Sequence, residues 1–122
     1  MKRMTDEYHE TDRTAIAQGQ GPGWLVPESL RANWILHLGD TRAVLPKVLA
    51  SLPELDLFIH DSEHTYEAMT FEYASVYPRL RKGGILGSDD VGWNRAFADF
   101  LRRESLPHVY VGGFGFTRKP SA

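Results

Sequence analysis

The sequence contains no cysteine, no long apolar run and almost no excess of charge of either sign. The absence of cysteine excludes a disulfide framework and thiolate metal sites. No apolar run approaches the length of a transmembrane helix, and residues 1–3 precede polar residues rather than the apolar core of a signal peptide. Fourteen basic and sixteen acidic residues give a net charge of −2, which predicts no nucleic-acid partner. We therefore expect a cytoplasmic protein that binds neither nucleic acid nor a membrane.

The length and composition are those of one domain, because 122 residues with 42% hydrophobic side chains can form a modest core. Residues 1–23 carry much charge and little periodicity, so we expect an irregular N-terminal arm before an α/β domain over residues 24–122. Glycines between residues 19 and 23 form a G-x-G-x-G string. A cofactor loop must follow a buried strand and open a helix, which the preceding residues 11–18 do not predict. We interpret these glycines as a connector.

The most informative stretch covers residues 56–90, whose pattern predicts a strand, a helix and a second strand. The apolar run 57–59 is typical of a buried parallel strand, and residues 85–86 form a shorter run of the same kind. Between them, residues 66–80 carry apolar side chains at three- and four-residue steps, as one face of a helix requires. The pattern indicates one strand–helix–strand unit.

Acidic residues follow both predicted strands of this unit. Asp61 comes after the first strand, and Asp89 and Asp90 come after the second. A right-handed crossover makes the strands parallel, so their carboxyl ends lie at the same sheet edge, about 4.8 Å apart if the strands are neighbours. Open α/β sheets bind ligands at that edge, and crowded carboxylates favour a cation or a polar substrate group as their partner. His60, at the end of the first strand, would only orient a carboxylate.

The flanking segments predict further elements of an α/β domain. These are a short helix over 24–31, a strand over 33–38, a helix over 42–51, an amphipathic helix after Trp93 and an antiparallel hairpin formed by 108–111 and 114–118. Pro46 predicts a bend or a helix start near Leu45, and Pro78 predicts a kink or a tightened last turn. Trp93 and Asn94 come soon after the acidic pair, and they either pack or face the site.

These motifs resemble the C-terminal half of class I S-adenosylmethionine-dependent methyltransferases. In one branch of that family the fourth strand ends in Asp-x-x-His-x-Tyr, here Asp61, His64 and Tyr66, and the fifth follows Gly-Gly and ends in Asp-Asp, here Asp89 and Asp90. The similarity covers roughly residues 33–117. It implies a truncated Rossmann-like methyltransferase fold with a mainly parallel sheet and a C-terminal antiparallel hairpin. The first two strands, with the glycine-rich cofactor loop, would be absent.

The resemblance also implies a set of site residues. Asp40 would lie near the adenine amine of S-adenosylmethionine, although it is equally suited to capping the following helix. Asp61 would contact the cofactor and take part in catalysis, with His64 as the base. His64 is equally suited to a turn in which its ring hydrogen-bonds the next helix. Metal-dependent catechol-type O-methyltransferases carry an Asp after the fourth strand and an Asp-Asn pair after the fifth. By that similarity Asp61, Asp89 and Asp90 are candidate ligands of a divalent metal such as magnesium.

The implied function is methyl transfer from S-adenosylmethionine to an oxygen of a small molecule. Two alternatives stay open. Without the cofactor loop the chain would be an inactive methyltransferase-like fragment or an interaction module, and the Asp/His cluster would also suit a metal-dependent hydrolase. The strand over 33–38, deprived of a neighbour, would either close onto the next strand or leave an open edge that invites a homodimer.

Overall fold

The structure, a computed structural model, describes residues 18–121, so most of the predicted N-terminal arm lies outside the described residues. The chain divides between Val44 and Leu45 into two compact units, and each is described by itself. No helix among the described residues is long and apolar enough to cross a membrane.

In the first unit, a 3-10 helix, η1, covers Glu28–Asn33 and follows Pro27, close to the short helix predicted there. The strand predicted over residues 33–38 is wrong, because residues 34–38 form no ladder. Ile35 and Leu38 are 77% and 60% exposed. A strand is stable only when a neighbour satisfies its backbone N–H and C=O groups, and none of the described residues of this unit supplies that pairing.

Helix α2 covers Thr41–Ala50 and begins where Asp40 caps it. The Asp40 carboxylate accepts a hydrogen bond from the backbone N–H of Arg42 at 2.9 Å, and its carbonyl accepts from Val44, also at 2.9 Å. This is the capping alternative predicted for Asp40. Because Pro46 lies inside the helix rather than at its start, the predicted start near Leu45 is wrong.

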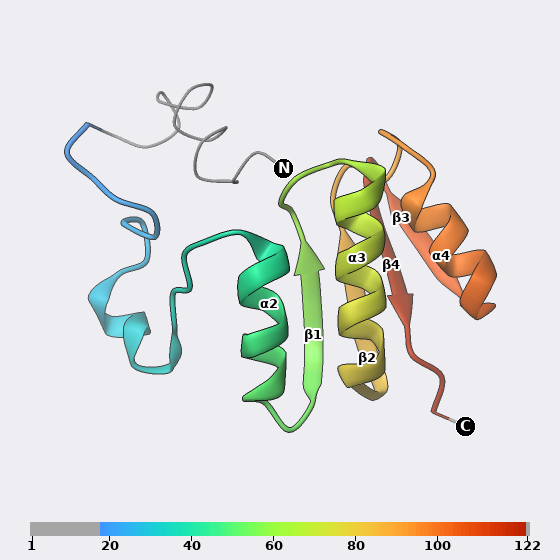
Figure 1. The fold of residues 1–122 in the computed structure, drawn as a ribbon, viewed down its shortest axis with the longest axis horizontal. Coiled ribbons are helices and arrows are strands. Elements are labelled where there is room, and N and C mark those ends of the chain that lie inside the picture. The colour runs from blue at the N-terminus through green and yellow to red at the C-terminus, as the bar shows by residue number, and fades with distance from the viewer. Residues whose placement is uncertain (1–17, 122) are drawn as a thin grey trace. The chain divides into compact units, whose positions relative to one another are not determined.

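The second unit is an α/β layer with four strands (Figure 1). Its elements are β1 (Leu55–His60), α3 (Tyr66–Val76), the 3-10 turn η2 (Tyr77–Arg79), β2 (Leu80–Ser88), α4 (Ala96–Glu104), β3 (His108–Val111) and β4 (Phe114–Arg118). The predicted strand–helix–strand unit and the C-terminal hairpin are both confirmed. The turn η2, which contains Pro78, is the predicted tightened last turn.

Parallel pairing is a minority in this sheet, so the expectation of a mainly parallel sheet is wrong for the part of the chain that the structure describes. The strand order is β1-β2-β4-β3. Only β1 and β2 run parallel, whereas β4 pairs antiparallel with both β2 and β3. The reason is that the hairpin contributes two antiparallel pairs, while the segment expected to pair on the other side of β1 is not a strand.

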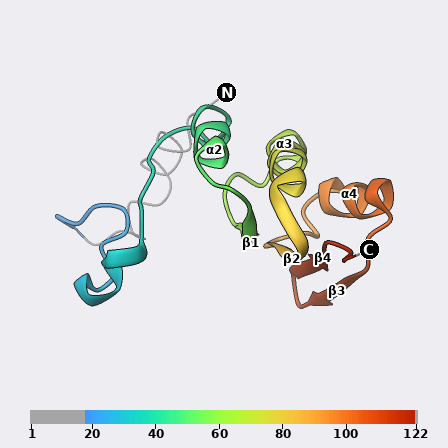
Figure 2. The same cartoon turned by 90° about the horizontal axis from the view of Figure 1, so that it is seen from below.

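The core lies between the sheet and the helices α3 and α4, which cover the same face of the sheet (Figure 2). Tyr73 of α3 is fully buried against Phe97 and Phe100 of α4, at ring-centroid distances of 5.8 and 5.2 Å. The buried Tyr73 hydroxyl forms a hydrogen bond with Ser88 Oγ at 2.6 Å. This packing anchors α3 beside the carboxyl end of β2, which holds the start of the acidic segment in place.

The close contact between Gly115 and Phe97 provides a test of this packing. A Cβ atom at position 115 would lie 2.5 Å from Phe97 Cε1, so Gly115→Ala should overpack the core and lower the free energy of unfolding by about 1–3 kcal/mol. Urea denaturation measures this difference. Gly113→Ala is the matched control, because the nearest atom to its Cβ would be 4.0 Å away. Equal stability of the two variants would contradict the packing described.

Candidate functional site

The register between β1 and β2 brings the two acidic segments to one edge of the sheet. Ile59 pairs with Gly87 and His60 pairs with Ser88, so Asp61 and Asp89 are the next residues on neighbouring strands. The backbone N–H of Asp89 donates to the carbonyl of His60 at 2.9 Å, which continues the ladder past the end of both strands. The predicted juxtaposition of Asp61 and Asp89 is confirmed.

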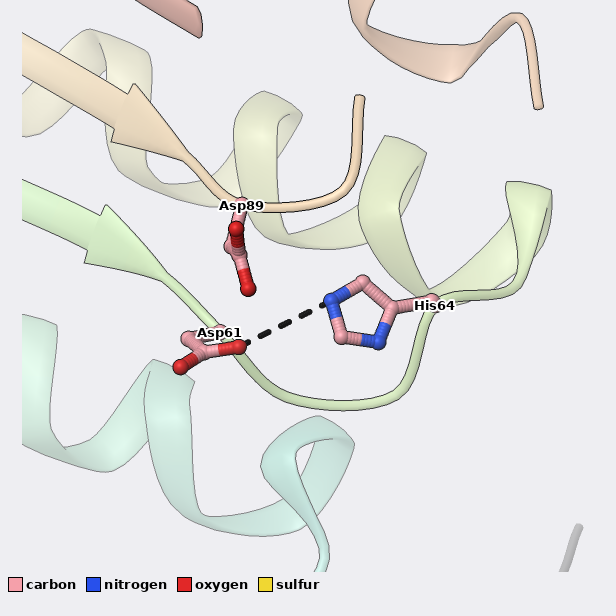
Figure 3. Close-up of side chains that lie close together, drawn as sticks. All are labelled: Asp61, His64 and Asp89. Carbon is pink, nitrogen blue, oxygen red and sulfur yellow. Dashed lines mark ion pairs between the residues drawn. The ribbon is translucent and has the colours of Figure 1, made fainter. Parts of the chain in front are cut away.

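Three side chains converge at this edge (Figure 3). Asp61, His64 and Asp89 each offer one ligand atom, and these atoms all lie within 4.8 Å of one another. The two carboxylates extend from the ends of β1 and β2, while the imidazole comes from the loop before α3. Nε2 of His64 lies 3.7 Å from Oδ1 of Asp61. We call these three residues the donor cluster.

Asp90, the third predicted metal ligand, lies outside the donor cluster and His64 takes its place. Its backbone has a φ of 48°, a left-handed conformation that turns the chain away from the direction of β2. Its carbonyl accepts from Trp93 N at 3.1 Å, which closes the turn. The Asp90 carboxylate still reaches the edge of the cluster, with Oδ2 3.4 Å from Nε2 of His64.

His64 is held from two sides. Asn94 Nδ2 donates to the His64 carbonyl at 3.2 Å, while Asn94 Oδ1 accepts from the backbone N–H of Ala96, the first residue of α4, at 2.8 Å. The ring of Trp93 lies 5.0 Å from the His64 ring, although Trp93 itself is largely exposed. Among the described residues, the buried Nε2 atom of His64 has no hydrogen-bond partner. An unpartnered nitrogen beside carboxylates is suited to a cation or to a proton.

The sequence interpretation missed Glu72. This residue is 3% exposed and lies on the apolar face of α3, next to Tyr73. Its carboxylate contacts Nδ1 of His60 and accepts a hydrogen bond from Ser62 Oγ at 2.7 Å. The available signal was its helical spacing, since Glu72 falls three residues after Met69 and four before Val76 on the face that is otherwise apolar.

The pKa of the Asp61 carboxyl group is raised above its ordinary value. The largest cause is burial, followed by a hydrogen bond to Asp89 and the negative charge of Asp89, while the charges of His64 and His60 act in the opposite direction. The Asp61 side chain is 65% exposed, so solvent screens much of this interaction. A bound proton therefore relieves the repulsion between Asp61 and Asp89, and a cation at the same position would do the same.

Asp40, predicted to contact the cofactor, belongs to the first unit. One oxygen of its carboxylate is bound to the backbone N–H of Arg42. The role of Asp40 at a cofactor stays a prediction.

Neutralising Asp61 should change stability in a pH-dependent way when chelator keeps the protein free of metal. Because the folded-state pKa of this acid is raised, its favourable contribution is present below the unfolded pKa and is lost as the pH rises through the folded value. Asp61→Asn, which stays neutral, should therefore gain melting temperature relative to wild type between pH 4 and pH 7. Circular dichroism at both pH values measures this gain.

The matched control is Asp56→Asn at the opposite end of β1, where the carboxylate contacts Arg81 rather than another acid. A constant difference in melting temperature between Asp61→Asn and wild type at the two pH values would contradict the proposed repulsion.

A comparison with known protein families identifies the family of this chain. A family model described as a methyltransferase domain matches residues 3–91, which include Asp40 and every residue of the donor cluster. The match begins well before residue 33, where the similarity was expected to start, and so includes most of the segment predicted to be an irregular arm. No curated protein matches the chain. The chain belongs to a methyltransferase domain family, as its resemblance to class I S-adenosylmethionine-dependent methyltransferases predicted.

Proposed function

We propose that this chain transfers a methyl group from S-adenosylmethionine to a hydroxyl oxygen of a small molecule. Membership in a methyltransferase domain family supports methyl transfer in general. The observation that carries the finer proposal is the donor cluster of Asp61, His64 and Asp89 at the carboxyl edge of a parallel strand pair. Ligands of open α/β sheets bind at this edge, and the cluster offers groups that can hold and deprotonate a hydroxyl.

The donor cluster fits a divalent cation. Ligand atoms about 2.0–2.2 Å from an ion lie roughly 3–4 Å from one another, so atoms within 4.8 Å need only a small closing movement. Nε2 of His64, buried without a hydrogen-bond partner, is a free ligand atom, and Asp90 Oδ2 at 3.4 Å is close enough to become a fourth donor. Mg²⁺ prefers an all-oxygen ligand set, whereas Zn²⁺ suits an imidazole and Mn²⁺ binds carboxylates while also accepting an imidazole nitrogen, so we propose Mn²⁺ or Zn²⁺ ahead of the magnesium first expected.

A cation held there would lower the pKa of a bound hydroxyl, as metals do for water. The residues of the chain would hold this cation in place. Asp61 and Asp89 would ligate it from two neighbouring strands, and His64 would be the third ligand. Asp61, which is mostly exposed at the edge, and Asp40 are the residues we propose for the cofactor. S-adenosylmethionine supplies an electrophilic methyl group when bound, so catalysis is mainly a matter of alignment.

A second role for His64 is favoured by its surroundings when no cation is bound. Its Nε2 lies 3.7 Å from Asp61 Oδ1 and 3.4 Å from Asp90 Oδ2. A nitrogen at this position, beside the groups that would hold the substrate, is placed to accept the hydroxyl proton directly. The two roles exclude each other, since one nitrogen cannot hold a metal and a proton together.

The homodimer was expected at an open edge left by a strand over residues 33–38, which does not form, so we propose the edge of β1 in its place. Among residues 18–121, β1 has a sheet neighbour on one side only. Leu57 and Ile59 on this strand are also about half exposed. A second copy of the chain would pair with this open edge.

Cation binding is tested by titrating the purified chain with Mn²⁺ in a calorimeter. Asp61→Asn should weaken the affinity by at least about tenfold, because it removes a charged ligand. Asp56→Asn, which removes an acid from the opposite end of the same strand, should bind Mn²⁺ as wild type does. Equal affinity in all three proteins would contradict a cation at the donor cluster.

Methyl transfer is tested by incubating the chain with S-adenosylmethionine and a panel of small phenols and alcohols, and by detecting the methylated product by mass spectrometry. With a cation in the site, chelator should abolish turnover and His64→Ala should reduce it by about 100-fold or more. Turnover that persists in chelator but is lost in His64→Ala would support the direct-base role instead.

Calorimetric titration with S-adenosylmethionine separates the remaining alternatives. The absence of heat at millimolar cofactor would contradict the proposal and favour an interaction module. Hydrolysis of a phosphoester without the cofactor would favour a hydrolase.

A further inference from the structure

Glu72 contributes a buried carboxylate whose two oxygens bind the two residues that flank Asp61. Oε1 accepts a hydrogen bond from Ser62 Oγ at 2.7 Å, and Oε2 contacts Nδ1 of His60. Because Nδ1 faces a carboxylate, it carries the proton and donates it. The residues before and after Asp61 are thereby tied to one rigid group on α3.

Helix stability does not account for an acid at this position. Glu72 lies among Met69, Tyr73 and Val76, all fully buried on the same helix. A buried carboxylate gains little over an apolar replacement even where it is hydrogen-bonded, because the cost of removing it from water offsets the hydrogen bonds that it accepts. An acid in this apolar environment therefore indicates a role in geometry.

We propose that Glu72 is a positioning residue, which fixes the direction of the Asp61 carboxylate by holding His60 and Ser62. This inference rests on the function proposed above for the donor cluster. Groups behind the ligands of a metal site commonly set the orientation of those ligands.

The contacts of His60 extend this positioning from Asp61 to the rest of the donor cluster. Its carbonyl accepts the backbone N–H of Asp89 at 2.9 Å, which ties the end of β2 to the end of β1. Its ring lies edge-on to the ring of His64, with centroids 5.4 Å apart. Through this one histidine, Glu72 is connected to all three donors.

The test measures Mn²⁺ affinity by calorimetry and stability by urea denaturation in the same variants. Glu72→Gln keeps the shape but replaces one acceptor oxygen by a donor, so it cannot accept from both His60 and Ser62. Ser62→Ala breaks one of the two ties on a partly exposed loop and leaves the buried carboxylate in place. Both variants should weaken Mn²⁺ binding on the order of tenfold.

The matched control is Ser75→Ala, which removes a hydroxyl from the same helix, where it bonds the carbonyl of Phe71. Ser62→Ala should weaken Mn²⁺ binding, whereas Ser75→Ala should bind Mn²⁺ as wild type does, and the urea midpoints verify that both variants are folded at the concentrations used. Affinities of Ser62→Ala and Glu72→Gln within about twofold of Ser75→Ala would overturn the positioning role. If Glu72→Gln fails to fold, the comparison of the two serine variants decides alone.

A wild-type chain that binds no Mn²⁺ would refute the proposed cation site but not the role of Glu72. In that case amide hydrogen exchange at residues 61–64 measures the positioning without any metal. Ser62→Ala should exchange faster there than Ser75→Ala, with equal rates in α4. Equal rates at residues 61–64 would overturn the proposal.

Discussion

The parallel hydrogen bonding between β1 and β2 is the constraint on which the site depends. A parallel pair has both carboxyl ends at one edge, so residues far apart in the chain arrive together without any contact between their side chains. The bond from Asp89 N to the His60 carbonyl continues this pairing by one more residue. A shift of one position in the register would send Asp61 and Asp89 to different levels of the edge.

The site brings the carboxylates of Asp61 and Asp89 close together, and neighbouring groups offset or restrain their mutual repulsion in different ways. The pKa of Asp61 rises under burial and the presence of Asp89, which keeps the cluster ready to exchange a proton for another cation. His64 brings a nitrogen that faces these carboxylates. Glu72 lies behind them in the core, bound to both neighbours of Asp61. Asp61 is therefore repelled by Asp89 while both of its neighbours in the chain are held in place by Glu72.

Local sequence patterns predicted most of the second unit, because the spacing of apolar residues within a short segment indicates whether it forms a helix or a strand and which face is buried. Residues 56–90 gave a strand, a helix and a parallel strand, and the hairpin across Gly112 followed from its turn. The strand predicted over 33–38 failed because pairing depends on a distant partner. Asp90 left the cluster through a backbone turn with a φ of 48°, which residue type does not reveal. A role for Glu72 could be inferred only by noticing that this acid lies on the face of α3 that is otherwise apolar and buried.

The central claim, that two parallel strands and one loop form a single donor site, is tested most directly by pulsed electron paramagnetic resonance. The measurement uses Mn²⁺-loaded protein in which histidine carries ¹⁵N. The account predicts a ¹⁵N hyperfine coupling from one imidazole, which disappears in His64→Asn. A Mn²⁺ spectrum without nitrogen coupling, or one unchanged in His64→Asn, would contradict it.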